Sequence, residues 1–133
     1  MAEIEFKINA SVAVEMIIEL YESAGLARPV DDKARIEKMY TNSNLVISAW
    51  DGARIVGVAR AITDFSWCCY LMDLAVRKDV QHSGVGRKLV EMVRETVGEN
   101  SNVLLLSAPE AVGFYPKIGM EKVDSSFIFK RRN

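Results

Sequence analysis

The chain has 133 residues, of which 50% are hydrophobic and 26% charged, and its formal net charge is -1. This composition is typical of an ordered globular protein, and the length suits one domain, which we expect to span residues 1–133. The slightly acidic balance argues against a general nucleic-acid-binding protein, because such proteins usually carry a basic excess. No apolar run approaches the roughly 20 residues of a membrane span. We therefore expect a cytoplasmic protein with neither a nucleic-acid nor a membrane partner.

The residues that most often bind metals are scarce. The sequence has two cysteines, Cys68 and Cys69, and one histidine, His82. Adjacent cysteines inside an apolar run are poorly placed to bridge distant segments, and no Cys/His/Asp group has ligand spacing. The sequence therefore predicts reduced thiols and no metal site.

The first part of the chain predicts a strand, two helices and then a hairpin. Apolar residues alternate with polar ones over 4–8, and Ser11 can cap a helix that Gly25 ends near residue 24. Asp31 or Asp32 can open a second helix through about residue 40. Strands are then expected over 45–50 and 54–62, because the Asp51-Gly52 pair between them is a strong hairpin signal.

The second part predicts one long helix packed on the sheet. After a strand over 67–76, apolar residues recur every four positions from Val85 to Val97, which indicates a helix that Gly98 ends. We expect a buried strand over 103–106, a short helix from Pro109 to Ile118, and strands over 120–123 and 126–129. The fold class is therefore mixed α/β (α+β), with a largely antiparallel sheet of six to seven strands and about four helices.

The segment from Leu74 to Leu89 carries the chemical signal. A strand leads into a turn with Gly84 and Gly86 and then directly into an amphipathic helix. Free N–H groups at a helix start bind anions, and glycines let a phosphate approach closely. The sequence does not match a dinucleotide-binding loop, which requires Gly or Ala at the position of Leu89. It does not match a P-loop either, which requires Lys-Ser/Thr after the glycine. A flexible turn that only begins a helix remains the alternative.

The run Gln81-His82-Ser83-Gly84-Val85-Gly86 resembles the Gln/Arg-x-x-Gly-x-Gly/Ala pyrophosphate loop of the GNAT (GCN5-related N-acetyltransferase) superfamily. The resemblance implies acetyl-CoA as co-substrate, held by loop amides and by the strand before the loop. Basic residues at 77, 78, 87 and 88 suit a polyanionic coenzyme, although a solvated basic face is the alternative. The implied coenzyme-binding residues are Leu74, Ala75, Val76, Gln81, His82, Ser83, Gly84, Val85, Gly86, Arg87 and Lys88.

A second resemblance lies downstream. The run from Ala111 to Met120 is similar to the Ala-x-x-Phe-Tyr-x-x-x-Gly-Phe segment of the same superfamily, with Met120 in place of the last Phe. By this resemblance, Tyr115 would be the catalytic acid that protonates the departing thiolate, although a core aromatic is the alternative. The sequence departs from the pattern at Ala108, where many members have Asn, so a coenzyme contact is expected to be missing there.

These observations predict an N-acetyltransferase that moves an acetyl group directly from acetyl-CoA to a primary amine, on a small molecule or a protein. The acceptor is not identified. Asp73, Glu110 or water could take the amine proton, whereas His82 is a weak candidate. The alternatives are a non-catalytic acyl-CoA-binding regulatory module and a nucleotide binder. An exposed last strand could also pair in a homodimer.

Overall fold

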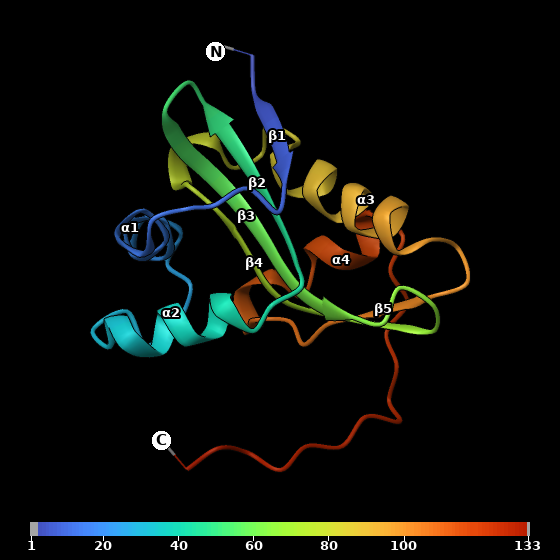
Figure 1. Cartoon of the computed structure of the whole chain (residues 1–133). Coiled ribbons are helices and arrows are strands. Elements are labelled where there is room, and N and C mark those ends of the chain that lie inside the picture. Colours follow the sequence, from blue (N-terminus) through green and yellow to red (C-terminus); the bar gives the residue numbers. More distant parts are fainter. Residues whose placement is uncertain (1–2, 133) are drawn as a thin grey trace.

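The structure is a computed structural model and describes residues 3–132. Its centre is a five-stranded sheet in the order β1-β2-β3-β4-β5, in which only the β4–β5 pair is parallel. Helices α1 and α2 cover one face of this sheet, and α3 covers the other (Figure 1). None of the helices in this part of the chain is long and apolar enough to cross a membrane. The predicted mixed α/β class is confirmed.

Helices α1 (Val14–Ala24) and α2 (Lys33–Thr41) follow strand β1 (Glu5–Ile8), as the sequence predicts. The α1 stop is also confirmed, because Gly25 takes a φ of 73° that an L side chain rarely adopts. Its start is not at Ser11: Ala13 occupies the N-cap position, without a side-chain hydrogen bond. Asp32 caps α2, since its carboxylate accepts from the Arg35 N–H at 3.1 Å.

Strands β2 (Leu45–Asp51), β3 (Arg54–Thr63) and β4 (Cys68–Val76) form the antiparallel centre of the sheet. The register of β3 and β4 shifts at one point: Arg60 lies opposite Asp73, but Ala61 lies opposite Leu71. Met72 is therefore an extra residue, a β-bulge on β4. In a regular strand Leu71 and Asp73, two residues apart, would share one face of the sheet. Because of the bulge, Leu71 packs in the core under α3, whereas Asp73 lies among residues of the α1 face.

Helix α3 (Val85–Val97) lies close against the sheet through its apolar stripe. Five residues of this stripe are almost fully buried, namely Val85, Leu89, Val90, Val93 and Val97. The approach is closest at Gly57 of β3, where an added Cβ would lie 3.1 Å from side-chain atoms of both Leu89 and Val85. A glycine at this position therefore lets the helix contact the strand directly.

The C-terminal part differs from the prediction. Strand β5 (Asn102–Leu104) is shorter than expected, and the helix expected over 109–118 divides into a 3-10 turn, η2 (Pro109–Ala111), and the single-turn α4 (Phe114–Lys117). The strands predicted over 120–123 and 126–129 do not form within residues 3–132, so the sheet has five strands rather than six to seven. The prediction was wrong because a strand needs an adjacent partner, which alternation alone does not supply.

Candidate functional site

Strands β4 and β5 separate to form an opening in the sheet. They pair only at Cys68–Asn102, Cys69–Val103 and Tyr70–Leu104, although β4 continues to Val76. The Val76 carbonyl accepts from the Gln81 side-chain amide at 2.9 Å, so it points away from β3. By strand alternation the polar backbone groups of Leu74 face the same way, whereas those of the intervening Ala75 face β3. The second half of β4 therefore presents unpaired backbone groups in an opening beside β5.

The start of α3 lies next to this opening and offers free hydrogen-bond donors. Gly84 is the N-cap with a φ of 92°, and no side chain caps the helix there. The Lys88 N–H bonds to the Gly84 carbonyl at 3.0 Å, but the N–H groups of Val85, Gly86 and Arg87 have no partner among residues 3–132. These donors, with the positive end of the helix dipole behind them, form a site for an anionic group.

The loop that precedes α3 is held by its own hydrogen bonds. Besides the Gln81 side-chain bond to β4, the Ser83 hydroxyl donates to the Val80 carbonyl. His82 takes a φ of 67°, the left-handed region that a histidine rarely adopts. Val85 is 4% exposed and packs in the core, so it contributes to the loop only through its backbone. The sequence motif thus folds as one turn whose shape is held by side-chain hydrogen bonds to the backbone.

The basic residues predicted to face the coenzyme are not equivalent. Arg77 is engaged by Glu19, with 2.5 Å between Nη1 and Oε1, and Arg87 contacts Glu91 at 3.2 Å. Lys78 and Lys88 are exposed and form no ion pair within the described part of the chain. Lys88, with Ser83, Gly84 and Val85 of the loop, lines a hollow of about 220 Å³ beside β1. Lys88 is therefore the cation best placed to meet a phosphate near α3, whereas the Lys78 side chain lies near Gly25 at the end of α1.

Tyr115 lies on α4, close to both the α3 start and the loop between α1 and α2. Its neighbour Phe114 would be 3.5 Å from a Cβ at Gly86, which places α4 against the first turn of α3. Burial raises the pKa of the Tyr115 phenol, and the nearby Arg28 guanidinium opposes this rise. A phenol with a raised pKa stays protonated near neutral pH, and its hydroxyl has no hydrogen-bond partner among residues 3–132. Tyr115 is therefore a neutral phenol whose proton is free to be donated.

A buried charged cluster lies on β4 beyond the bulge. The Asp73 carboxylate is 1% exposed and accepts hydrogen bonds of 2.6 Å from Arg28 Nε, Arg60 Nε and the Tyr21 hydroxyl. Arg28 also donates to the Met72 carbonyl at 2.8 Å, and Tyr21 contacts the Tyr40 hydroxyl at 2.5 Å. The cluster therefore joins the α1–α2 loop to the bulge of β4.

The same contacts decide the protonation state of Asp73. Burial alone would raise the pKa of its carboxyl group, but the hydrogen bond and charge of Arg60, with Tyr21 and Arg28, lower it below its usual value. Burial raises the pKa of Tyr21 and of Tyr40, so both phenols remain neutral. An ionised carboxylate whose oxygens already accept three hydrogen bonds is a weak proton acceptor. The geometry therefore favours a positioning role for Asp73 over that of a general base.

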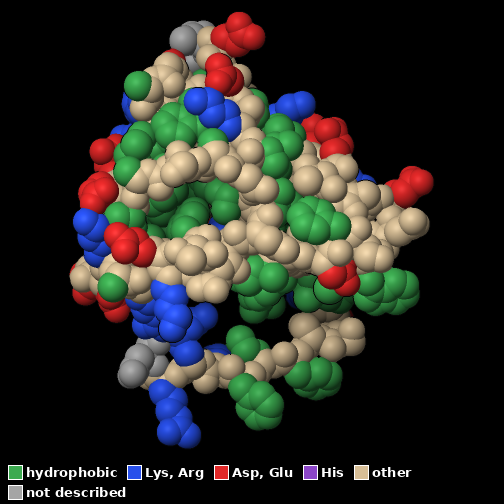
Figure 2. Space-filling view, in the orientation of Figure 1, with side chains coloured by type: hydrophobic (Ala, Val, Ile, Leu, Met, Phe, Trp, Pro, Cys, Tyr) green, Lys and Arg blue, Asp and Glu red, His purple; other side chains and the backbone are tan. Residues whose placement is uncertain are grey.

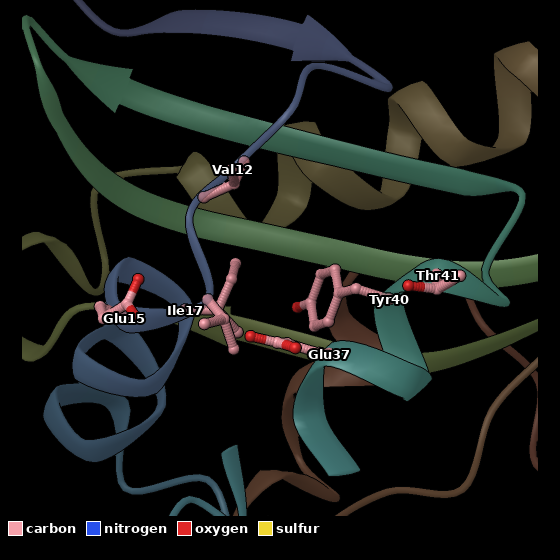
Figure 3. A pocket seen from close by; sticks show the side chains of 7 residues that line it. Val12, Glu15, Ile17, Glu37, Tyr40 and Thr41 are labelled. Carbon is pink, nitrogen blue, oxygen red and sulfur yellow. The ribbon is translucent and has the colours of Figure 1, made fainter. Parts of the chain in front are cut away.

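A separate hollow of about 400 Å³ lies between α1 and α2 (Figure 3). Ile17, Glu37 and Tyr40 line it, with Glu15 at one side, where that carboxylate pairs with Lys33. Because α1 and α2 cover the face of the sheet opposite α3, this hollow is not part of the anion site. The Tyr40 hydroxyl, through Tyr21, links it to Asp73.

A sequence profile of the family described as "Acetyltransferase (GNAT) domain" matches residues 17–131, which include strands β2 to β5, the α3 loop and Tyr115. The chain belongs to this acetyltransferase family. A curated relative, the uncharacterized N-acetyltransferase ycf52 of Pyropia yezoensis, is 28% identical over 133 residues, which cover 90% of this chain and 74% of the relative. The activity class of the GNAT chain is thus that of an N-acetyltransferase.

Solved structures agree with the GNAT fold. A GNAT-family acetyltransferase from Streptococcus pneumoniae superposes with a TM-score of 0.80 at 24% identity, covering 98% of this chain and 100% of the other. The aminoglycoside N-acetyltransferase AAC(6')-Iy, solved in complex with CoA, has a TM-score of 0.75 at 15% identity, covering 100% and 97%. At these identities the likeness concerns the fold alone.

The GNAT site also contains residues that the sequence did not reveal, namely Arg28, Arg60, Tyr21 and Tyr40. The sequence did contain one signal: Arg60 and Asp73 are charged residues within mainly apolar strand segments. A charge buried in this way requires a partner. Of the other candidates, Glu110 is exposed on η2, and Ala108 is the N-cap of that turn, where it offers no side-chain hydrogen bond. No group of three or more His, Cys, Asp or Glu side chains able to hold a metal occurs among residues 3–132.

Proposed function

We propose that this GNAT protein transfers an acetyl group from acetyl-CoA to a primary amine in one direct step. The observation that carries the proposal is the row of free N–H groups at Val85, Gly86 and Arg87, beside the opening between β4 and β5. A pyrophosphate fits such donors, and Lys88 adds positive charge. The pantetheine arm would then lie along the backbone of Leu74 and Val76 that faces the opening. GNAT structures of this fold bind CoA, as in AAC(6')-Iy.

The transfer needs few protein groups. The neutral amine attacks the thioester carbonyl, the carbon–sulfur bond breaks, and the electron pair leaves on the coenzyme sulfur. Tyr115 donates its phenolic proton to this thiolate and is reprotonated from solvent. Arg28, fixed by Asp73 and Met72, lies near the phenol and holds the α1–α2 loop against β4. The proton released by the amine passes to water, because the hydrogen bonds and charges around Asp73 lower the pKa of its carboxyl group and make it a weak proton acceptor.

The direct test is release of free CoA thiol from acetyl-CoA in the presence of a panel of primary amines. We expect at least one amine to give turnover above the rate of acetyl-CoA hydrolysis. A protein that binds acetyl-CoA but acetylates no amine in a broad panel would instead be the non-catalytic acyl-CoA-binding module. A protein that binds neither acetyl-CoA nor CoA would contradict the proposed coenzyme site itself.

Substitution of Gly84 tests the anion site. Asparagine tolerates positive φ better than other residues, so Gly84→Asn keeps the turn while its side chain enters the space where the phosphate would bind. We expect at least about tenfold weaker acetyl-CoA binding, which is about 1.4 kcal/mol. Gly52→Asn is the matched control, since Gly52 has a φ of 61° and open space but lies in the β2–β3 turn. Equal affinities for the two variants would place the pyrophosphate elsewhere.

A further inference from the structure

The turn before the coenzyme loop, the name we give to residues 81–86, is held between the two faces of the sheet. It is a single turn of 3-10 helix, η1 (Lys78–Val80), which follows the end of β4. Val80 is 7% exposed and packs in the core under α3, whereas Arg77, the N-cap residue of η1, reaches α1 on the opposite face. Contacts on both faces therefore determine where η1 lies and where the coenzyme loop begins.

Arg77 is the centre of a network of four charged side chains. Its Nη1 lies 2.5 Å from Glu19 Oε1 on α1, and its Nε lies 3.8 Å from Asp79 Oδ1 on η1. Asp79 in turn binds Arg54 of β3, with 2.6 Å between Oδ2 and Nη2. The Arg77 side chain is only 16% exposed, and its Nε has no hydrogen-bond partner among residues 3–132. An unconstrained arginine would place this donor in water, so the ion pairs hold the side chain where it is.

Lys78 makes a second connection to the same helix. Its Cε and Nζ atoms would lie 3.8 and 4.0 Å from a Cβ at Gly25, the C-cap of α1. A cation at this end of a helix is favourable, because the helix dipole is negative there. The surface over α1 carries acidic and basic side chains close together (Figure 2), so specific ion pairs act there rather than a field of one sign. Two consecutive cations, Arg77 and Lys78, thus fasten the end of β4 to α1.

The coenzyme loop needs such support because part of its backbone is strained. His82 has a φ of 67°, and Gly84 has a φ of 92°. A histidine in the left-handed region is unfavourable and persists only where the surrounding structure determines it. If fewer chains hold the loop in this form, the apparent affinity for a ligand of the loop falls by the same factor. Contacts that fix η1 can therefore control coenzyme binding without touching the coenzyme.

We propose that Arg77 is a positioning residue of the coenzyme loop: through Glu19 and Asp79 it fixes η1 against α1 and so keeps the N–H groups at the α3 start in place for the pyrophosphate. This inference rests on the acetyl-CoA site proposed above. The alternative is a direct contact between the Arg77 guanidinium and a coenzyme phosphate. The two roles differ in the part played by Glu19, which supports Arg77 in the first and competes with the phosphate for it in the second.

Substitution of Glu19 separates the two roles by the sign of its effect. The Glu19 side chain is 68% exposed, so Glu19→Gln should break the pair with Arg77 and still fold like the wild type. The positioning role predicts at least about threefold weaker acetyl-CoA binding, with a raised KM and an unchanged kcat. A direct phosphate contact predicts tighter binding, because the substitution frees Arg77 and removes a negative charge. Glu22→Gln is the matched control, since Glu22 is exposed on the same helix and forms no ion pair among residues 3–132.

Substitution of Arg77 gives a second test by titration calorimetry with acetyl-CoA. We expect at least about tenfold weaker binding for Arg77→Met, and recovery of most of the affinity for Arg77→Lys, which keeps a cation near Glu19. Adding Glu19→Gln to Arg77→Met should weaken binding no further, because both changes remove the same contact. If circular dichroism shows that Arg77→Met does not fold, the comparison of Glu19→Gln with Glu22→Gln decides alone.

The outcomes distinguish this proposal from the coenzyme site on which it rests. If the wild type binds acetyl-CoA and Glu19→Gln binds it as tightly as Glu22→Gln, or more tightly, the positioning role is overturned and the coenzyme site stands. A loss of kcat with unchanged acetyl-CoA affinity would also overturn the positioning role. A wild type that binds neither acetyl-CoA nor CoA would overturn both.

Discussion

At the scale of single residues, the site combines a neutral phenol with a fixed ion pair. Tyr115 has a raised pKa because it is half-buried, and it lies near Arg28, whose guanidinium is held by Asp73 at 2.6 Å. An acid that remains protonated is suited to a leaving thiolate, whereas Asp73, which accepts three hydrogen bonds and has a lowered pKa, is a weak proton acceptor. In the proposed mechanism, Tyr115 supplies the proton and Asp73 positions Arg28, the residue near both of them.

Replacing Tyr115 with phenylalanine tests the first role. The change removes one hydroxyl and keeps the ring, whose contact with Phe114 is an edge-to-face pair at 5.1 Å. Loss of a general acid typically lowers the rate by about 10²–10⁴-fold, and we expect the lower end because a thiolate is already a tolerable leaving group. The measurement is kcat and acetyl-CoA affinity with the best amine. Unchanged kcat would remove Tyr115 from catalysis, and weaker binding with unchanged kcat would make it a coenzyme contact.

Replacing Asp73 with asparagine tests the second role. The substitution leaves the buried Arg60 guanidinium and the half-buried Arg28 without their carboxylate, and breaking a buried pair in this way typically costs about 3–5 kcal/mol. Urea unfolding should show a loss of this size. Glu91→Gln is the control, since it breaks the exposed pair with Arg87 and should cost at most about 0.5 kcal/mol. Similar losses for the two variants would show that the cluster does not stabilise the fold.

At the scale of elements, the position of α3 depends on its contact with β3. The helix start supplies the anion site, and the stripe from Val85 to Val97 determines how closely that start approaches the sheet. Gly57 is the point of closest approach. A change there therefore acts on both the core and the loop.

Gly57→Ala should destabilise the protein by about 1–3 kcal/mol, the usual cost of inserting a methyl group into a packed core. The new Cβ would lie 3.1 Å from Leu89 and Val85 side-chain atoms, so α3 or these side chains must shift. Gly113→Ala is the control, because Gly113 has a φ of -77° and no neighbour within 4 Å of an added Cβ. Urea unfolding of both variants gives the comparison. A Gly57→Ala protein as stable as the control would mean that α3 adjusts without cost.

The turn between β3 and β4 should respond to acid. The Asp64 carboxylate accepts from the N–H groups of Ser66, Trp67 and Cys68, and these bonds lower its pKa from 3.8 to about 2. Because the folded-state pKa is the lower one, its stabilisation is present above pH 3.8 and is lost as the pH falls toward 2. Asp64→Asn should therefore be less stable than the wild type at pH 6, with a smaller difference at pH 2.5. A difference that does not change between these two pH values would contradict this account.

At the scale of the whole molecule, coenzyme binding should stabilise the fold. The donors at the α3 start and the opening beside β4 exist only in the folded chain, so acetyl-CoA should raise the free energy of unfolding by about 2.7 kcal/mol at a concentration 100 times its Kd. Thermal unfolding with acetyl-CoA, CoA and ATP measures this effect. We expect a clear rise in Tm with the first two and much less with ATP. No shift at millimolar acetyl-CoA would count against the proposed coenzyme site.

The sequence predicted most of this architecture because its signals are local. Periodicity located α3, Asp32 marked the start of α2, and Gly25 and Gly98 marked helix ends, since each depends on neighbouring backbone groups. The loop from Gln81 to Gly86 and the position of Tyr115 followed from motif resemblance, and their functional roles stay predictions. The Asp73 cluster was not predicted, because its members at 21, 28, 40, 60 and 73 meet only through tertiary packing. The prediction of the last two strands was wrong for the same reason, because the partner that a strand needs cannot be inferred from the sequence of that strand alone.

The extra residue Met72 reverses the alternation of side chains between the two halves of β4. Before it, Cys69 and Leu71 face α3; after it, Leu74 and Val76 face α3 while Asp73 and Ala75 face α1. Deleting Met72 would remove the bulge and leave Asp73 opposite Arg60. Deleting a residue before Met72 while the bulge persists would instead turn every later side chain to the opposite face and bring the aspartate into the apolar core under α3. In this protein, one extra residue in β4 determines which face of the sheet carries the charged cluster.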